Sequence, residues 1–503
     1  MSSECSNQIQ FCTVELRNTK YEARSAFRSI DWVLVLLYAT LMVCGAVSIY
    51  AASYDYDHAS MFSLTEFSGR QFLWIGISLL IGFCILIIDR RFFEAYAYPI
   101  YAVAVFLMVL TIFVATDIKG SRSWIVLGPI SFQSAEFGKF ATALALAKLF
   151  GGYNFVLNRS YKNYIKAFAI ILVPIILIFL QKETGSAIVY TSLIFVLYRE
   201  GMSGFVLFAG LCAVTFFVVV VKYSESMLMG IPLGEFITFI IIMVIMIGMV
   251  AFYSKSLKTA RNLLLGFMGC GVIAYGLTFV DIYINGLVFF FVVIGGGLVY
   301  LLVAMFVEKL RKVIPTLLFV LASVGFMFTV DYAFNNALEP YQQMRIKVSL
   351  GLEEDLRGAG YNVNQSKIAI GSGGVTGKGF LNGTQTKLKY VPEQHTDFIF
   401  CTIGEEQGFI GTTLILVLYL ALILRIIHIA ERQRTAFGRV YAYCVASYLI
   451  FHLGINIGMV VGLSPVIGIP LPLFSYGGSA LLAFTMQLFI LLKIDSARRE
   501  FGN

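Results

Sequence analysis

The sequence predicts an all-α fold: a polytopic transmembrane helical bundle of about fourteen spans with one large extracytoplasmic loop. Three observations lead to this prediction. The chain of 503 residues is 59% hydrophobic and 13% charged, about half the charged fraction of soluble globular proteins. Apolar runs of about 17–25 residues recur from end to end, and each is long enough to cross a bilayer as a helix. Basic residues gather in alternate connections between these runs.

The predicted spans follow the apolar runs in chain order. The first run is longer than the core of a signal peptide and is therefore expected to stay as a span. The run 132–151 is the least apolar, and 185–199 is short. The full set is 32–50, 71–88, 95–115, 132–151, 164–180, 185–199, 202–222, 235–253, 262–280, 286–306, 314–332, 398–425, 438–462 and 473–493.

The distribution of basic residues tests this number of spans. Under the positive-inside rule, the connections that carry them face the cytoplasm, so both termini are predicted to be cytoplasmic. The net charge of +8 is then a topology signal, and no nucleic-acid partner is expected. The residues concerned are Arg17, Lys20, Arg24, Arg28, Arg90, Arg91, Arg159, Lys162, Arg199, Lys255, Lys258, Arg261, Lys309, Arg311, Lys312, Arg432, Arg434, Arg439, Arg498 and Arg499.

This topology places the one long connection, 334–397, outside the membrane. Loops longer than about 12–15 residues are usually functional or disordered. This loop lacks Pro/Ser low complexity, so we expect it to be folded or ordered by substrate. Its glycine-rich run fails the phosphate-loop pattern, because Ser372 and Gly379 stand where that pattern requires Gly and Ser or Thr. No nucleotide is therefore expected, and the glycines either form tight turns or contact substrate directly.

The loop ends in the most informative motif, residues 390–400. There Glu393, His395 and Asp397 alternate at spacing two, just before an apolar run. They offer acid and base chemistry at a membrane surface, where a lipid-linked polar substrate would present itself. The alternative is an interfacial carboxylate at the start of a helix, which the helix dipole favours.

A second candidate is a charged pair inside a predicted span. Glu136 and Lys139 are three residues apart and so share one helix face. Charges within spans are costly and indicate a functional site, although a shallow structural ion pair is the alternative. Arg122 precedes this helix on the outer side, where it either meets a phosphate or anchors at the interface beside Trp124.

A third candidate is the segment 468–479, in which two prolines and a glycine pair interrupt helical continuity. Irregular backbone at membrane depth has to line protein or a water-filled cavity. The segment is thus expected to border a substrate cavity, or else to form a kinked helix entrance. His452 and Asn456 lie one turn apart in the preceding span and are expected to form interhelical hydrogen bonds.

Several of these motifs together resemble the SEDS family (shape, elongation, division and sporulation). The resemblance is strong over 341–495 and fair over 31–200, and Pro470-Leu471-Pro472 is similar to the RodA branch rather than to FtsW. The motifs that carry it are Asn364-Gln365-Ser366, Gly371-Ser372-Gly373-Gly374, Asn382-Gly383-Thr384-Gln385, Pro392-Glu393-Gln394-His395-Thr396-Asp397-Phe398, Gly404-Glu405-Glu406 and Ser475-Tyr476-Gly477-Gly478-Ser479.

The resemblance implies a peptidoglycan glycosyltransferase of cell elongation and shape maintenance. Such a protein polymerises lipid II at the outer face of the bacterial cytoplasmic membrane. It works with a class B penicillin-binding protein transpeptidase and other elongation-complex membrane proteins. A lipid II flippase and a non-catalytic scaffold for a transpeptidase are the alternative functions, because a polar intramembrane pair suits transport as well.

The resemblance also assigns roles to residues. It maps the family's essential loop aspartate onto Asp397, our candidate general base, and its fourth-helix pair onto Glu136 and Lys139. A divalent cation, Mg²⁺ or Mn²⁺, is a candidate cofactor, with Asp397 and Glu136 as possible ligands. The candidates for substrate binding are Arg122, Ser366, Gln385, Lys387, Lys389, Glu393, His395, Ser475, Gly477, Gly478 and Ser479.

The chain departs from the family pattern in three places. Gln133-Ser134-Ala135-Glu136 replaces Gln-Pro-Ser-Glu, and 181–186 replaces Gln-Pro-Asp-Leu-Gly-Thr. An additional stretch supplies four helices beyond the family's ten or so. The predicted segments are 1–30 (cytoplasmic), 31–222 (N-terminal family helices), 223–310 (additional helices), 311–333 (helix before the loop), 334–397 (large outer loop), 398–495 (C-terminal helices) and 496–503 (cytoplasmic tail).

Overall fold

The computed structural model describes residues 30–54, 66–118, 121–127, 130–279, 285–336, 338–353, 358 and 360–497. The predicted cytoplasmic segments 1–30 and 496–503 lie almost wholly outside these residues. The chain divides into two compact units, Met1–Met202 with Tyr361–Asn503 (unit 1) and Ser203–Gly360 (unit 2).

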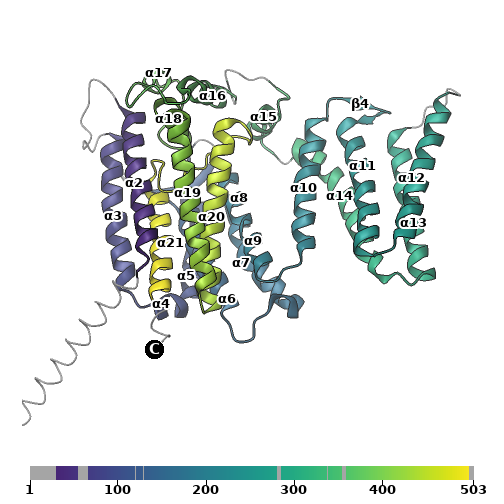
Figure 1. The fold of residues 1–503 in the computed structure, drawn as a ribbon, viewed down its shortest axis with the longest axis horizontal. Helices are drawn as coiled ribbons and strands as arrows, with labels where there is room; N and C mark the ends of the chain where they lie inside the picture. Colours follow the sequence, from purple (N-terminus) through teal and green to yellow (C-terminus); the bar gives the residue numbers. More distant parts are fainter. Residues whose placement is uncertain are drawn as a thin grey trace, which may run out of the picture. The chain divides into compact units, whose positions relative to one another are not determined.

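Unit 1 joins the two ends of the sequence in one helical bundle (Figure 1). A three-stranded antiparallel sheet, β1(Thr116–Ile118), β2(Ser121–Leu127) and β3(Ile130–Gln133), precedes α6. The helices are α2(Trp32–Ser53), α3(Phe67–Ile87), α4(Arg90–Ala95), α5(Ala97–Val114), α6(Ser134–Phe150), α7(Tyr161–Leu180), α8(Thr184–Thr191), α9(Leu193–Arg199), α16(Tyr361–Gly373), α17(Thr384–Lys387), α18(Ile399–Glu406), α19(Gly408–Arg432), α20(Ala436–Val461) and α21(Gly478–Ser496), with a 3₁₀ turn at Leu157–Arg159.

Unit 2 contains the predicted additional helices and has an aromatic core of its own. Phe239 stacks on Phe290 with ring centroids 4.8 Å apart. Its elements are α10(Gly204–Lys222), β4(Met227–Leu228), β5(Ile231–Pro232), α11(Leu233–Gly248) continued by a π-helical turn at Met249–Tyr253, α12(Leu257–Thr278), α13(Gly286–Val307), a 3₁₀ turn at Arg311–Val313, α14(Ile314–Asn336) and α15(Pro340–Ser349).

The all-helical membrane architecture is confirmed, with differences in detail. Among the described residues, twelve helices are long and apolar enough to cross a membrane. The predicted span 132–151 is the 17-residue α6, which begins only after β3 ends. The predicted span 185–199 consists of two short helices, α8 and α9, that meet at Ser192. The five short strands were not part of the prediction.

The predicted span 398–425 is also divided, and a glycine explains where. Gly408 has a φ of +65°, a backbone conformation that favours glycine. A Cβ at this position would press against backbone atoms of Gly377 and Val375. The chain therefore turns at this glycine, so that α18 precedes the long span α19.

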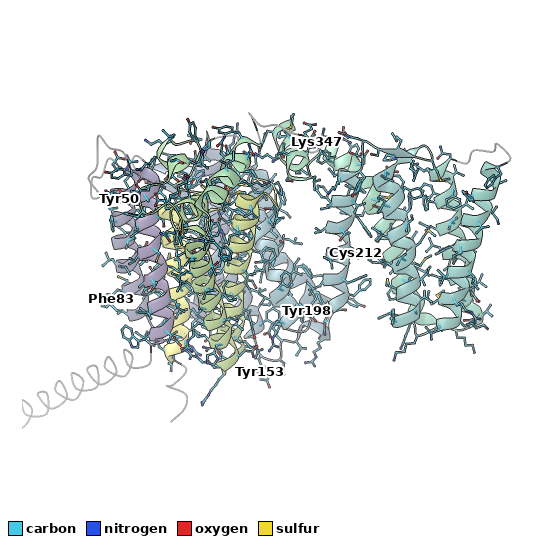
Figure 2. All side chains as sticks on the ribbon, turned by 45° about the horizontal axis from the view of Figure 1, so that its top comes forward. Tyr50, Phe83, Tyr153, Tyr198, Cys212 and Lys347 are labelled. Carbon is cyan, nitrogen blue, oxygen red and sulfur yellow. The ribbon has the colours of Figure 1, made fainter. Side chains whose placement is uncertain are left out.

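The surfaces of both units carry many apolar side chains. Phe83 on α3 is 50% exposed and projects from unit 1 (Figure 2). On a helix of a multi-pass protein, such side chains suit contact with lipid tails. The interior of unit 1 is the reverse, because α6 is buried along most of its length and packs against α5, α7, α20 and α21.

An ion-pair network joins α2, α19 and α21 at the ends of these helices that are predicted to face the cytoplasm. Arg425 donates to both carboxylate oxygens of Asp31, at 3.0 Å (Nε to Oδ1) and 2.7 Å (Nη2 to Oδ2). Arg432 donates to Asp31 at 2.7 Å and also pairs with Asp495. Burial alone would raise the pKa of Asp31, but the hydrogen bonds from Arg425, Leu34 and Arg432 hold that pKa below its usual value.

The network gives the first testable prediction. Asp31→Asn should lower the free energy of unfolding by about 3 kcal/mol, because it leaves two partly buried arginines without their shared anion. Thermal unfolding of the purified protein in detergent measures this effect. Asp89→Asn is the matched control, since exposed Asp89 also caps a helix, α4, but through a backbone N–H alone. Equal shifts in the two variants would contradict the role given to the network.

Candidate functional site

The small sheet in front of α6 is attached to the turn after α7. Trp124 of β2 pairs with Gln133 of β3, the residue immediately before α6. The backbone N–H of Arg122 donates to the carbonyl of Gln181 at 3.0 Å, while the Arg122 side chain is exposed. The Gln181 side chain in turn donates to the carbonyl of Met108 on α5 at 2.8 Å. The sheet therefore fixes where α6 begins.

The predicted pair Glu136 and Lys139 lies in the first turns of α6 and is buried. Lys139 Nζ donates to Glu136 Oε1 at 2.5 Å, and both residues are at most 2% exposed. The same ammonium lies 2.7 Å from Nε2 of His452, which belongs to α20. A charged ammonium has only donors, so His452 Nε2 accepts this hydrogen bond.

A second carboxylate, Glu183, lies beside the start of α6. Gln133 Nε2 donates to Glu183 Oε1 at 2.6 Å, and Ser186 donates to the same oxygen. The remaining oxygens, Glu136 Oε2 and Glu183 Oε2, are buried without a hydrogen-bond partner among the residues that the structure describes. A buried carboxylate oxygen without a donor is costly, so these two oxygens are candidates to contact a substrate or a cation.

Asp397 stands two residues before α18 and is partly exposed. Asn456 Nδ2 donates to the Asp397 carbonyl at 2.8 Å and to the Ile469 carbonyl at 2.7 Å. A Cβ added to Gly468, whose φ is +77°, would lie 3.4 Å from Asp397 Oδ2. The Asp397 carboxylate therefore faces the irregular segment predicted to border a cavity.

The neighbours of Asp397 form a turn rather than a strand. Glu393 has a φ of +54° and accepts from Thr396 Oγ1 at 3.2 Å. The His395 ring stacks on Phe67 with ring centroids 4.1 Å apart, and its carbonyl accepts from the backbone N–H of Tyr476 at 2.9 Å. The alternating spacing of the motif thus does not place its three acid–base residues on one face.

Glu405 holds α17 and the turn before it against α18. Its carboxylate accepts from Lys378 Nζ at 2.8 Å, from Thr384 Oγ1 at 3.1 Å, and from the backbone N–H groups of Gln385 and Thr386 at 2.8 and 2.9 Å. The Thr386 hydroxyl adds a fifth bond at 2.6 Å. Burial alone would raise the pKa of Glu405, but these donors lower it to about 2.

The adjacent Glu406 behaves in the opposite way. Burial raises the pKa of Glu406 to about 7, and the anion of Glu405 beside it adds to the rise. The two carboxylates therefore differ in charge near neutral pH, since Glu405 is ionised and Glu406 is partly protonated. Both residues stand in the motif Gly404-Glu405-Glu406, from which no role was predicted for either.

Of the remaining predicted residues, the serines are buried, whereas Gln385, Lys387 and Lys389 are at least partly exposed. Ser366 is buried and donates to the Val460 carbonyl at 3.0 Å, and Ser475 accepts from the Leu471 backbone N–H at 2.8 Å. Gly477 and Gly478 begin α21, where a Cβ on Gly478 would overlap the Trp74 ring. Ser479 is buried, Gln385 and Lys387 are half-buried, and Lys389 is exposed.

Two features bear on a metal ion. One buried oxygen each of Glu136 and Glu183 has no hydrogen-bond donor in the described ranges of the chain. Within the described part of the chain, however, no three His, Cys, Asp or Glu side chains cluster as a set of metal ligands. These residues do not suffice to hold a cation by themselves. They do fit a cation that is also bound by substrate phosphates, because Mg²⁺ commonly takes one or two carboxylates together with substrate oxygens.

Three residues around Glu136, Lys139 and Asp397 were not among the predicted site residues, namely Glu183, His452 and Asn456. Glu183 stands within one of the departures from the family pattern, which was the available signal. His452 and Asn456 were expected to form interhelical hydrogen bonds. This is confirmed for His452, whose partner Lys139 belongs to α6, but it is wrong for Asn456, whose partners Asp397 and Ile469 lie in non-helical segments. Their partners could not be foreseen from spacing, because His452 is 313 residues from Lys139 and Asn456 is 59 residues from Asp397.

The fold and the buried group of Glu136, Lys139 and His452 define a multi-pass membrane protein with a charged site between its helices. The family model of the cell cycle proteins FtsW, RodA and SpoVE matches residues 31–231 and 243–500. The peptidoglycan glycosyltransferase MrdB of Escherichia coli K12 is 30% identical over 471 residues, which cover 93% of this chain and 94% of that protein. The chain therefore belongs to the FtsW/RodA/SpoVE family, the SEDS family predicted from its motifs.

Another relative agrees with this assignment, and solved structures show the same fold. The peptidoglycan glycosyltransferase RodA of Treponema pallidum is 28% identical and covers 93% of this chain and 97% of its own length. A chain from a peptidoglycan synthase complex aligns with a TM-score of 0.57 at 23% identity, covering 93% of this chain and 98% of its own. RodA of Thermus thermophilus aligns with a TM-score of 0.52 at 22% identity, covering 93% and 97%. The predicted class of enzyme, a membrane-embedded glycosyltransferase, is confirmed.

The Glu405 cluster gives the second testable prediction. Glu405→Gln should release α17. Both oxygens of the carboxylate accept hydrogen bonds from neighbouring donors, whereas the NH2 group of an amide cannot accept and carries no negative charge. Trypsin should then cleave after Lys387 and Lys389 about tenfold faster, as expected when a charged hydrogen-bonded group is lost.

Glu406→Gln is the matched control for this proteolysis experiment. A carboxyl group with a pKa near 7 is already partly protonated in the neutral range, so its amide should leave the cleavage rate nearly unchanged. Cleavage of Glu405→Gln at the wild-type rate would show that the loop does not depend on this carboxylate.

Proposed function

We propose that this chain is a peptidoglycan glycosyltransferase that polymerises lipid II into glycan strands during cell elongation and shape maintenance. The observation that carries the proposal is the position of α20. One face of this helix binds the ammonium of Lys139 through His452 and the backbone of Asp397 through Asn456. A candidate base and a candidate cation for a diphosphate are thus attached to the same rigid element. The E. coli and T. pallidum relatives are named as peptidoglycan glycosyltransferases.

In the proposed reaction, the 4-hydroxyl oxygen of lipid II attacks C1 of the terminal sugar of the growing glycan. The new C1–O bond forms as the bond from C1 to undecaprenyl diphosphate breaks. Asp397 takes the proton of the hydroxyl, and the diphosphate leaves as the anion. A well-placed general base contributes about 10²–10⁴-fold to such a step.

The leaving diphosphate needs positive charge in its vicinity. Lys139 is our first candidate, followed by Arg122, Lys387 and Lys389. Burial of Lys139 beside Glu136 supports this order, because an ammonium in a site of low dielectric acts more strongly on a developing anion. Glu136 orients Lys139 through their hydrogen bond. We propose that Ser366, Gln385, Glu393, His395, Ser475, Gly477, Gly478 and Ser479 shape the substrate cavity around this centre.

A divalent cation is part of the proposal. We propose that Mg²⁺ or Mn²⁺ binds together with the substrate diphosphate, with Glu136 and Asp397 as its protein ligands. The unpartnered oxygen of Glu136 supports this assignment. When bound, the ion would supply charge for the leaving group, and the roles of Asp397 and Lys139 described above stand without it.

We further propose that the chain lies in the bacterial cytoplasmic membrane with both termini in the cytoplasm and the site outside. The alternation of basic connections supports this orientation. The ends of α9 and α19, with Arg199 and Arg432, lie at the opposite end of unit 1 from α16 and α17 (Figure 1). The role in elongation, rather than division or sporulation, is supported by the Pro470-Leu471-Pro472 sequence.

We propose a class B penicillin-binding protein transpeptidase as the partner, within a complex of other elongation proteins. The fold supports this partner, because the aligned synthase complex is described as coordinating polymerization and crosslinking. A chain that adopts the same fold can present similar surfaces to a transpeptidase. We therefore propose that the present chain also binds one.

Asp397→Asn tests the proposed chemistry. The variant should remain folded but lose at least about 10²-fold in turnover, because an amide cannot accept the proton of the hydroxyl. The assay is polymerisation of fluorescent lipid II by the purified protein, with and without its transpeptidase, read as glycan ladders.

Asp89→Asn serves as the control for this assay, because Asp89 is exposed and caps α4. Ladders of normal intensity from Asp397→Asn would remove Asp397 from the role of base. Movement of labelled lipid II across vesicles without polymer would instead support a flippase. Polymer from neither wild type nor variant, with transpeptidase binding intact, would support a scaffold.

Chelation tests the proposed cation. EDTA should abolish polymerisation, and excess Mg²⁺ or Mn²⁺ should restore it, because the substrate diphosphate and one or two carboxylates suffice to bind either ion. Wild-type rates of polymerisation in EDTA, with metal content verified by elemental analysis, would exclude the ion from the reaction.

A further inference from the structure

One face of α20 contributes two buried polar side chains that the proposed reaction does not use. His452 and Asn456 are four residues apart, so their side chains lie on the same side of the helix, about 6 Å apart along its axis. They are 1% and 0% exposed. Both reach the segment that faces Asp397, since His452 Nδ1 lies 3.3 Å from the Pro470 carbonyl and Asn456 donates to Ile469.

The hydrogen bonds of His452 define one tautomer. Lys139 donates to Nε2, so this nitrogen carries a lone pair. The proton is then on Nδ1, which donates to the carbonyl of Pro470. A doubly protonated ring would have no acceptor for Lys139. His452 is therefore a neutral imidazole that connects the buried ammonium to the Pro470 backbone.

Lys139 needs this second partner to hold one position. Glu136 is on the same helix and constrains the ammonium from one side only. His452 reaches it from α20, and the His452 ring meets the ring of Phe484 edge to face at 5.0 Å. The Phe484 ring also lies 5.5 Å from Lys139 Nζ. The His452 ring thus has a fixed orientation, and the Lys139 ammonium is held between α6 and α20.

We propose that His452 is a positioning residue that directs Lys139 toward the substrate diphosphate and couples it to the 468–470 segment beside Asp397. This inference rests on the proposed function, and it adds a residue that acts through Lys139 rather than on the substrate. Asn456 anchors the Asp397 backbone from the same face. The alternative is that His452 only joins helices by packing.

Two amide substitutions separate these roles. The amide of a glutamine extends to the position of Nε2, whereas that of an asparagine reaches only the position of Nδ1. His452→Gln therefore keeps the acceptor for Lys139, and His452→Asn keeps the donor to Pro470. We expect His452→Gln to retain at least half of the wild-type turnover of fluorescent lipid II. We expect His452→Asn to lose about tenfold to hundredfold in kcat, the loss of one hydrogen bond to a charged group.

Thermal midpoints and a control histidine complete the experiment. The two variants should unfold at similar temperatures, and the same two substitutions at His428, an exposed residue of α19, should leave turnover unchanged. Equal turnover of His452→Gln and His452→Asn, at any level, would overturn the proposal, as would greater activity of the asparagine variant.

A second measurement does not depend on catalysis. The chain has four histidines, so ¹⁵N NMR of imidazole-labelled protein can resolve His452 by comparison with His452→Gln. The expected signal is a neutral ring protonated on Nδ1, and Lys139→Met should shift the Nε2 resonance. A ring protonated on Nε2 would overturn the inference. Failure of wild type to polymerise lipid II would count against the proposed function while leaving this result interpretable.

Discussion

The buried ammonium of Lys139 is the constraint on which the arrangement of unit 1 depends. Removing a charge from water costs several kcal/mol even after relaxation, unless a counter-charge and hydrogen bonds compensate it. Glu136 supplies the counter-charge from the same helix, and His452 supplies an acceptor from α20. The α6 helix can therefore be buried almost all round only where α20 packs against it. An ion pair of this kind is weak evidence for stability, whereas ionisable residues inside a membrane span indicate a functional site.

In the outer part of unit 1, buried side chains likewise provide hydrogen-bond partners, here for backbone groups rather than for a charge. Asn456 binds the carbonyls of Asp397 and Ile469, and Gln394 binds those of Ala52 and Thr386 at 2.6 and 2.9 Å. Glu405 satisfies the first N–H groups of α17. Loop backbone buried near a membrane has no water to bind, so these side chains act as its partners and order the connection around Asp397.

Glycines permit this close packing at a few positions. Gly377 and Gly408 have positive φ values, and each would place a Cβ against the backbone of the other segment. The glycine-rich run thus serves to pack the turn against α18, which agrees with the expectation of tight turns.

The sequence by itself determined the helical membrane architecture, the family and the pair Glu136 and Lys139, because hydropathy, motif sequence and helical spacing are local properties of the chain. It did not determine that α6 is shortened by a strand, or that a glycine divides the helix after Asp397. It also left His452, Asn456, Glu183 and Glu405 without their partners. Apart from Ser186, which is three residues from Glu183, those partners lie at least 13 residues away along the chain, and only the packing of unit 1 brings them within hydrogen-bonding distance. The tertiary structure decided them because burial forces each polar group to find a partner, and most of these partners belong to another segment of the chain.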